Sequence, residues 1–276
     1  MIYKLFRLKT NKMKTIKISM MALLGLTLTL STSCKKKTVE PTPEVDPGKG
    51  SVSIVLTHKW GMMNEQNFVL GSNLIHPMHK QKDTLNFSTF KYYVSNIKFK
   101  KADGTYYVHP ESYFLVDLSN LATTTLSIPD VPAIDYTEMS YTLGVDSAKT
   151  VSGAQAGALD PVNKMFWVWN TGYVATKAEG TYLKNKVVTP FRFHLGGYKV
   201  PNNVVTTKTI AFSTNNLTVS ANKASKVKIT VNPGTLFHGT SVKTLDMIHE
   251  PGADAVSMAV GFFTHSFGFM FDSIEE

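Results

Sequence analysis

Two histidines and a pair of tryptophans are the residues of this chain whose types and spacing could do metal chemistry: His58, His194, Trp167 and Trp169. The two tryptophans stand two residues apart, so on a strand their rings would project from the same face. A neutral imidazole is the commonest protein metal ligand, and an indole is a large ring with a single N–H donor. Ordinary core packing also accounts for such a cluster, so residue types alone leave both interpretations open.

The alternation around His58 predicts an inward-facing imidazole. His58 and Trp60 continue the phase of Val52, Ile54 and Leu56, so both side chains point into the core if the strand persists. A buried neutral imidazole needs partners at its ring nitrogens, and a metal ion can be one of them. A strand-end histidine held by a backbone carbonyl is the alternative.

His194 has the opposite phase. Phe191, Phe193 and Leu195 share one face of the expected strand, so a straight strand turns His194 away from the main core. Gly196 and Gly197 follow directly, and they could bend the strand or let another segment approach closely. The sequence leaves these two possibilities open.

A second group of metal-ligand types lies in an expected loop. His76, Met78 and His79 combine imidazole with thioether, the ligand set that Cu(I) prefers. Solvated loop side chains are the simpler interpretation, so these three are weaker candidates. For enzymes, the chain has no G-x-S-x-G elbow, P-loop or Rossmann fingerprint, and we expect no catalytic residues.

The first 33 residues predict a lipoprotein signal peptide. Six basic residues and no acidic ones precede an apolar run over 18–30, which is short for a membrane span. Small residues then precede Cys34, the single cysteine, which we expect to carry lipid after cleavage. A signal anchor that is never cut is the alternative. Residues 34–50 are polar and rich in Pro and Gly, which predicts a flexible linker between the lipidated cysteine and the folded part of the chain.

Processing changes the charge balance of the chain. The whole sequence has 29 Lys+Arg against 20 Asp+Glu, a net charge of +9. Loss of the six basic residues in 1–33 leaves 23 minus 20, or +3. The basic excess therefore belongs to export, and we expect no nucleic-acid partner.

Residues 51–276 predict an all-β fold, a single β-sandwich of immunoglobulin-like size or larger. Short alternating runs rich in β-branched residues recur along this part, with a bulge expected near Asn96 and a hairpin turn at Asp103-Gly104. One short helix is expected near the C-terminus, over 250–263, where apolar residues recur at helical spacing.

Several longer motifs carry a family resemblance that covers nearly all of 51–276. They are GVDS (144–147), SGAQAGALDP (152–161), MFWVWNTGY (165–173), FHLGG (193–197), FKYYVSNIKF (90–99), LVDLSN (115–120) and FMF (269–271). Together they resemble the MbnP-like family, most closely its lipoprotein branch of the Bacteroidota type.

The resemblance implies an extracytoplasmic β-sandwich that binds copper, in an outer-membrane lipoprotein of the cell envelope that faces the periplasm or the surface. In that family, histidines hold the metal together with a tryptophan that a dihaem cytochrome c peroxidase-like partner oxidises to kynurenine. The metal role is carried over to His58 and His194, and the oxidisable ring to Trp167 or Trp169. The alternative is a metal-free envelope module that binds a protein or a glycan through Trp167, Trp169 and Tyr173.

Overall fold

The computed structural model describes residues 46–61, 63, 65–76, 84–170, 172–212 and 215–275. These residues are mostly strand, as the alternating runs predict. The strands are β1 (Lys49–Trp60), β2 (Gln66–Asn67), β3 (Asn73–Ile75), β4 (Thr84–Lys101), β5 (Tyr106–Val108), β6 (Tyr113–Asp117), β7 (Thr125–Pro132), β8 (Asp135–Leu143), β9 (Phe166–Trp167), β10 (Gly172–Lys184), β11 (Val187–Gly196), β12 (Thr206–Ala211), β13 (Leu217–Thr218), β14 (Ala224–Val231), β15 (Met247–Ile248) and β16 (Phe269–Glu275). The helices are α1 (Ser147–Val151) and α2 (Ala253–Thr264), with short 3₁₀ helices at Leu121–Thr124, Gly157–Leu159, Pro161–Asn163 and Pro233–Phe237.

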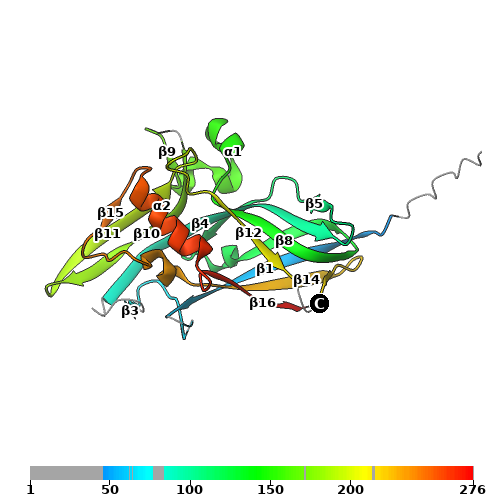
Figure 1. Cartoon of the computed structure of the whole chain (residues 1–276), viewed down its shortest axis with the longest axis horizontal. Coiled ribbons are helices and arrows are strands. Elements are labelled where there is room, and N and C mark those ends of the chain that lie inside the picture. The colour runs from blue at the N-terminus through cyan, green and yellow to red at the C-terminus, as the bar shows by residue number, and fades with distance from the viewer. Residues whose placement is uncertain are drawn as a thin grey trace, which may run out of the picture. The chain divides into compact units, whose positions relative to one another are not determined.

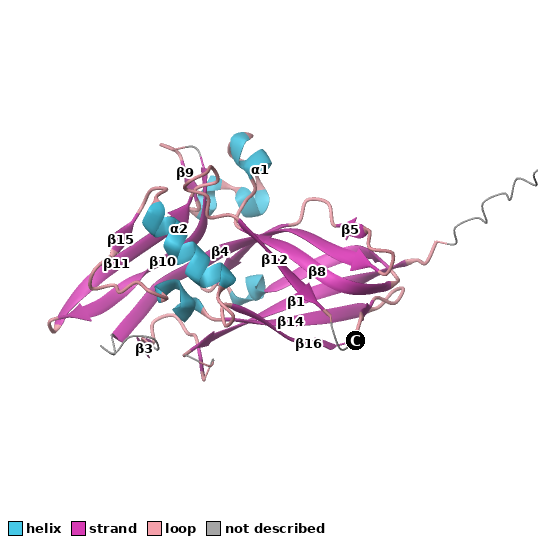
Figure 2. Cartoon of the chain, in the orientation of Figure 1, coloured by secondary structure: helices cyan, strands magenta, loops and turns pink. Residues whose placement is uncertain are grey.

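Two sheets make a β-sandwich, which confirms the predicted fold class (Figures 1 and 2). The smaller sheet runs β16-β14-β1-β2, with β7 also paired to β1. The larger sheet runs β12-β8-β4-β10-β11-β15, and the remaining short strands pair with β4, β8 and β10. β1 pairs parallel to β14 and antiparallel to β7, so it lies inside its sheet.

The main core lies between the sheets. Val52, Ile54 and Leu56 are buried on one face of β1, as their alternation predicts. From the larger sheet, Phe87, Phe90 and other aromatic side chains reach the same apolar cluster. β1 starts at Lys49, two residues before the expected boundary of compact structure.

The long strand β4 contains the predicted bulge. Asn96 adopts a φ of 52°, and the pairing with β8 shifts register between Ser95 and Lys98. Such a shift returns Ile97 and Phe99 to the core side after the bulge. The predicted turn at Asp103-Gly104 joins β4 to β5.

α2 forms where helical spacing predicts it, within three residues of the expected start and one of the expected end. Its buried face, including Ala255, Met258, Ala259 and Phe262, joins the main core. In Figure 1, α2 lies over the larger sheet beside β12 and β11.

A second, smaller core was not anticipated from sequence. It contains Tyr93, Val145, Leu159, Met165, Trp167, Tyr173 and Val174. The segment from Val145 to Tyr173, with α1 and two 3₁₀ helices, forms most of it. Tyr93 follows Tyr92, which belongs to the main core, so this second core lies on the outer face of the larger sheet.

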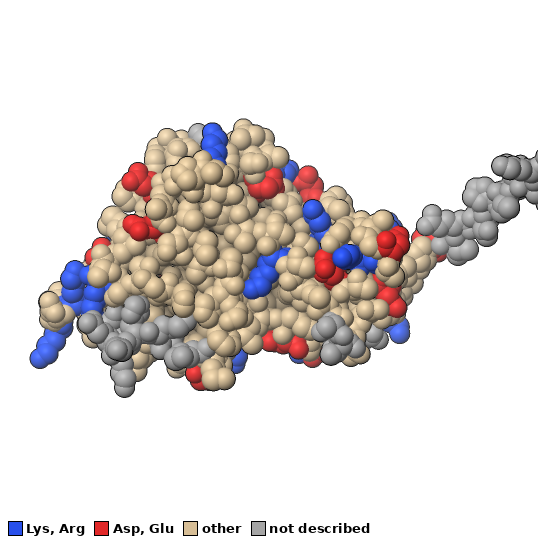
Figure 3. All heavy atoms as spheres, in the orientation of Figure 1, with Lys and Arg blue, Asp and Glu red and all other residues tan. Residues whose placement is uncertain are grey.

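Charged side chains are distributed unevenly over the face in Figure 3. Lys and Arg gather at the tip of the β10–β11 hairpin, and charges of both signs are scattered over the opposite end. Among the described residues, no helix is long and apolar enough to cross a membrane. The expected signal peptide, Cys34 and most of the linker lie outside the described residues.

Candidate metal and ligand sites

His58 lies inside the sandwich, as its strand phase predicts. Its side chain is 7% exposed, and its Nε2 lies 2.9 Å from the hydroxyl of Tyr92 on β4. Burial lowers the pKa of His58 to about 4, so its imidazole is neutral at physiological pH. Burial and the nearby Tyr141 phenol both raise the pKa of Tyr92, which keeps that phenol protonated.

Two further buried oxygens lie near this contact. The Tyr141 hydroxyl and the Thr176 hydroxyl have no hydrogen-bond partner within the described part of the chain. Tyr141 and Tyr92 both contact the ring of Phe269, and Thr176 lies directly opposite Tyr92 across the β4–β10 pair. We call His58, Tyr92, Tyr141 and Thr176 the inner polar cluster. Orphaned buried oxygens are costly, so they mark a place where water or an ion would be stabilised.

Trp60 and His76 lie further along the same interior. The Trp60 indole N–H donates to the Ile75 carbonyl at 2.7 Å, and the His76 ring meets the Trp60 ring edge-on at a centroid distance of 6.2 Å. His76 is 4% exposed, so the expectation of a solvated loop histidine was wrong for this residue. Packing against Trp60 and Phe237 explains its burial. Met78 and His79 lie outside the described residues.

His194 lies on the other face of the larger sheet. Its Nε2 is 2.7 Å from Glu179 Oε1, and the Lys177 ammonium is 3.6 Å from the same oxygen. His194 is directly opposite Lys177, which is directly opposite Lys91. Burial lowers the pKa of His194, while its contact with Glu179 acts in the opposite direction. As the strand phase predicts, this imidazole points away from the main core.

The two histidines therefore do not share a site. His58 contacts Tyr92 on the inner face of the larger sheet. His194 is aligned across the sheet with Lys177 and Lys91, and Lys91 is the residue before Tyr92 on β4. Because successive residues on a strand face opposite sides, His194 lies on the outer face. Within the described ranges, no three or more His, Cys, Asp or Glu side chains form a metal-binding group. A metal at either histidine would need other donors.

The tryptophan pair is split between interior and surface. β9 ends at Trp167, which is 7% exposed, whereas Trp169 is 63% exposed. The expectation that both rings share one face of a strand was wrong because the strand stops before Trp169. The rings still lie close, with centroids 5.6 Å apart. A Cβ at Gly196 would lie 2.5 Å from the Trp167 ring, so this glycine allows the indole to pack on β11.

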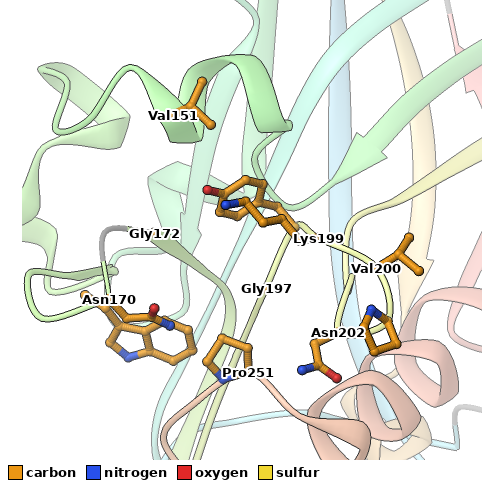
Figure 4. Close-up of a pocket in the computed structure, with 11 residues that line it drawn as sticks. Val151, Asn170, Gly172, Gly197, Lys199, Val200, Asn202 and Pro251 are labelled. Atoms are coloured by element: carbon orange, nitrogen blue, oxygen red, sulfur yellow. The ribbon is translucent and has the colours of Figure 1, made fainter. Parts of the chain in front are cut away.

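A pocket of about 470 Å³ opens beside Trp167. Figure 4 shows its lining drawn from separate segments, with Asn170 and Gly172 on one side and Asn202 and Pro251 on another. Tyr198, Lys199, Val200 and Pro201 complete much of its wall. We call this cavity the outer pocket. It lies away from the inner polar cluster, since none of that cluster's residues lines it.

Sequence reasoning missed Tyr92 and Tyr141 as members of a site. Both lie in the main core. A tyrosine at an inward strand position carries a hydroxyl that must find a partner, and this was the available signal. Which strand would bring it to His58 depends on long-range pairing, and the alternation pattern does not contain that information.

Comparison with known proteins gives a family and one related structure. A model of the MbnP family matches residues 49–253 of this chain. Among solved structures, MbnP from Methylosinus trichosporium matches with a TM-score of 0.47 and 13% sequence identity, over 75% of this chain and 87% of that one. No curated protein matches the chain.

Proposed function

The chain belongs to the MbnP family, and we propose that it is a copper-binding protein of the cell envelope without catalytic turnover. The family match covers most of the sandwich, from β1 to the start of α2. Copper is the cargo in this proposal, taken up or buffered outside the cytoplasm.

The observation that carries the proposal is the buried, neutral imidazole of His58. Imidazole is a good copper ligand, and a metal must displace any proton from it before it binds. Burial lowers the pKa of His58 to about 4, so protons do not compete near neutral pH. The hydroxyl of Tyr141, which lies near Tyr92, has no hydrogen-bond partner within the described ranges. The inner polar cluster would therefore stabilise a bound ion better than a purely apolar core would.

His58 would hold the metal, and its imidazole contacts the phenol of Tyr92, which in turn lies near Tyr141. Tyr92 also positions the imidazole, because the hydrogen bond at Nε2 fixes the ring orientation. When bound, copper would supply one-electron redox chemistry, and the apolar core would exclude water from it. His194 lies on the opposite face of the larger sheet, so any metal it binds occupies a second, partly buried position.

Oxidation of a tryptophan is the further part of the proposal. We assign it to Trp169 rather than Trp167, because the exposed ring of Trp169 is open to a haem-containing partner protein. Conversion to kynurenine breaks the C2–C3 bond of the indole and adds one oxygen at each of these carbons, with peroxide activated at the partner's haem as the oxidant. Hydrolysis of the resulting N-formyl group then releases C2 as formate, so the side chain gains one oxygen atom and loses one carbon. An intact-mass and peptide-mass measurement on protein from the native host would detect this change at position 169; an unmodified Trp169 would remove this part of the proposal.

Membrane attachment is also proposed. Lipidation of Cys34 would tether the domain to the outer membrane through the polar segment that follows. Labelling with a radioactive fatty acid should mark the wild type and leave a Cys34→Ala variant unlabelled. Equal labelling of both would contradict the anchor.

Copper titration of purified variants tests the assignment of His58. His58→Gln keeps a side chain that can hydrogen-bond Tyr92 but removes the imidazole, and we expect at least about tenfold weaker copper binding, the usual scale for a lost metal-site contact. His249→Ala is the control, since His249 is exposed. The His194→Gln variant shows whether part of the copper binds at His194 and not at His58. Unchanged affinity in folded His58→Gln would sink the assignment.

A further inference from the structure

We propose that the outer pocket binds a pyranose sugar that is neutral or negatively charged. The described lining of the pocket combines aromatic rings, side-chain amides and one lysine. Each of these features points to a compact polyhydroxylated ligand with an apolar face. The inference is independent of copper.

Aromatic and apolar groups supply the wall against which a sugar ring would lie. Trp167 and Tyr198 line the pocket together with Val200 and Pro201. A pyranose has one flat side made of C–H groups, which packs on aromatic and apolar surface. Val200 is 87% exposed, so burial by a ligand would remove apolar surface from water.

Side-chain amides supply the polar contacts. Asn170 and Asn202 both line the cavity, and neither side-chain amide has a hydrogen-bond partner among the described residues. In Figure 4 the two amides lie on separate sides of the cavity. Each amide offers donors and an acceptor, so the pair can hydrogen-bond the hydroxyl groups of one ring from two directions.

The charge of the lining disfavours cationic ligands. Lys199 is the charged side chain among the described lining residues, and its ammonium lies 5.2 Å from the centre of the Tyr198 ring. Neither Asp nor Glu lines the cavity in the described ranges. A carboxylate on the sugar would be attracted to Lys199, and an amino group would be repelled.

Shape and size also suit a small ligand. The volume of about 470 Å³ falls within the rough 300–1,000 Å³ range of small-molecule pockets. The wall is held by close backbone packing, since Gly197 has a φ of +125° and a Cβ there would lie 2.1 Å from the Asn202 carbonyl oxygen. This packing holds the Asn202 backbone against the end of β11, so the point from which its side chain projects is fixed by the fold.

Fluorescence titration of the metal-free full chain tests the proposal, because Trp167 in the wall reports on the pocket. The probes are glucose, galactose and mannose, their uronic acids, and glucosamine. Sorbitol is the matched ligand control, since it carries the hydroxyls without a ring face. We expect a saturable change with at least one hexose or uronic acid, weaker binding of glucosamine than of glucose, and no saturation with sorbitol.

Variants show whether the pocket is the place of binding. Asn202→Ala and Asn170→Ala should each weaken binding by about five- to tenfold, the scale of one lost hydrogen bond. Asn120→Ala is the control, because Asn120 caps a 3₁₀ helix remote in sequence and outside this lining.

Three results would overturn the proposal. They are no saturable signal with any sugar, tighter binding of glucosamine than of glucose, and equal affinity in the two pocket variants and the wild type. If the same face instead captures a protein from the native envelope while no sugar binds, the pocket is part of a protein interface and the proposal is wrong.

Discussion

At the scale of single residues, environment decides what each imidazole can do. His58 has lost nearly all contact with water, and its partner is a neutral phenol, so it stays uncharged and able to donate a lone pair. His194 has a carboxylate partner and two lysines on the same face. A cation at His194 would be repelled by the Lys177 ammonium, so His194 offers a poorer copper site than His58.

Asp146 illustrates a carboxylate whose charge stabilises the fold. It caps α1 by accepting from the Lys149 N–H, and it also accepts hydrogen bonds from Tyr113 and Asn96. Burial raises the pKa of Asp146, but the hydrogen bonds from Tyr113 and Asn96 outweigh it, so the pKa lies below the usual value. A lowered folded-state pKa means that stability is present above the unfolded pKa and is lost as pH falls through the folded pKa.

We predict that Asp146→Asn lowers the free energy of unfolding by about 1–2 kcal/mol near pH 7, because charged hydrogen bonds become neutral ones. The difference from wild type should shrink below about pH 4, where the ordinary carboxyl protonates in the unfolded chain. Urea unfolding across this pH range measures it. Asp135→Asn is the exposed control. A difference that stays constant down to pH 3 would contradict the role given to the charge.

At the scale of elements, a close approach between β9 and β11 holds the second core together. Gly196 brings β11 against Trp167, and a Cβ there would also lie 2.9 Å from the Tyr173 carbonyl oxygen. The same contact fixes the indole that forms one wall of the outer pocket. β9 has two residues, so its position depends on this packing more than on its own pairing.

We predict that Gly196→Ala destabilises the protein by about 1–3 kcal/mol, the usual cost of overpacking, and shifts tryptophan emission to longer wavelength as the Trp167 ring is displaced into water. Thermal unfolding and emission spectra measure both effects. Gly252→Ala is the control, because Gly252 has extended backbone and no atom within 4 Å of the added carbon. An unshifted spectrum would show that β9 is not held this way.

Elements with strong local patterns were predictable, and those set by long-range packing were not. Alternation placed β1 and the bulge at Asn96, and helical spacing placed α2. α1 was missed because a helix of five residues is too short to show a period. Trp169 was placed wrongly for a related reason, since the end of β9 at Trp167 depends on pairing with β10.

At the scale of the whole molecule, the sandwich depends on β1. This strand lies between β14 and β7 and buries Val52, Ile54, Leu56 and Trp60. Each such side chain contributes about 1.5–3 kcal/mol on burial. Their sum is comparable to the total stability of a typical domain, about 5–15 kcal/mol.

We therefore predict that a chain beginning at Asp46 unfolds at the same midpoint as the longer chain, because it keeps the whole of β1, the first of the described strands, which starts at Lys49. A chain beginning at Phe68 lacks β1 and β2 and should not fold cooperatively. Circular dichroism with thermal unfolding measures both. Cooperative unfolding of the shorter chain would mean that the other strands suffice.

The most direct measurement is the metal content of the protein purified from its native host grown with added copper. Burial of a neutral imidazole beside phenol oxygens predicts copper at close to one atom per chain. The copper should survive dialysis against a weak chelator, because water is excluded from the inner polar cluster. Folded protein that carries no copper would contradict the account, whatever the family to which the chain belongs.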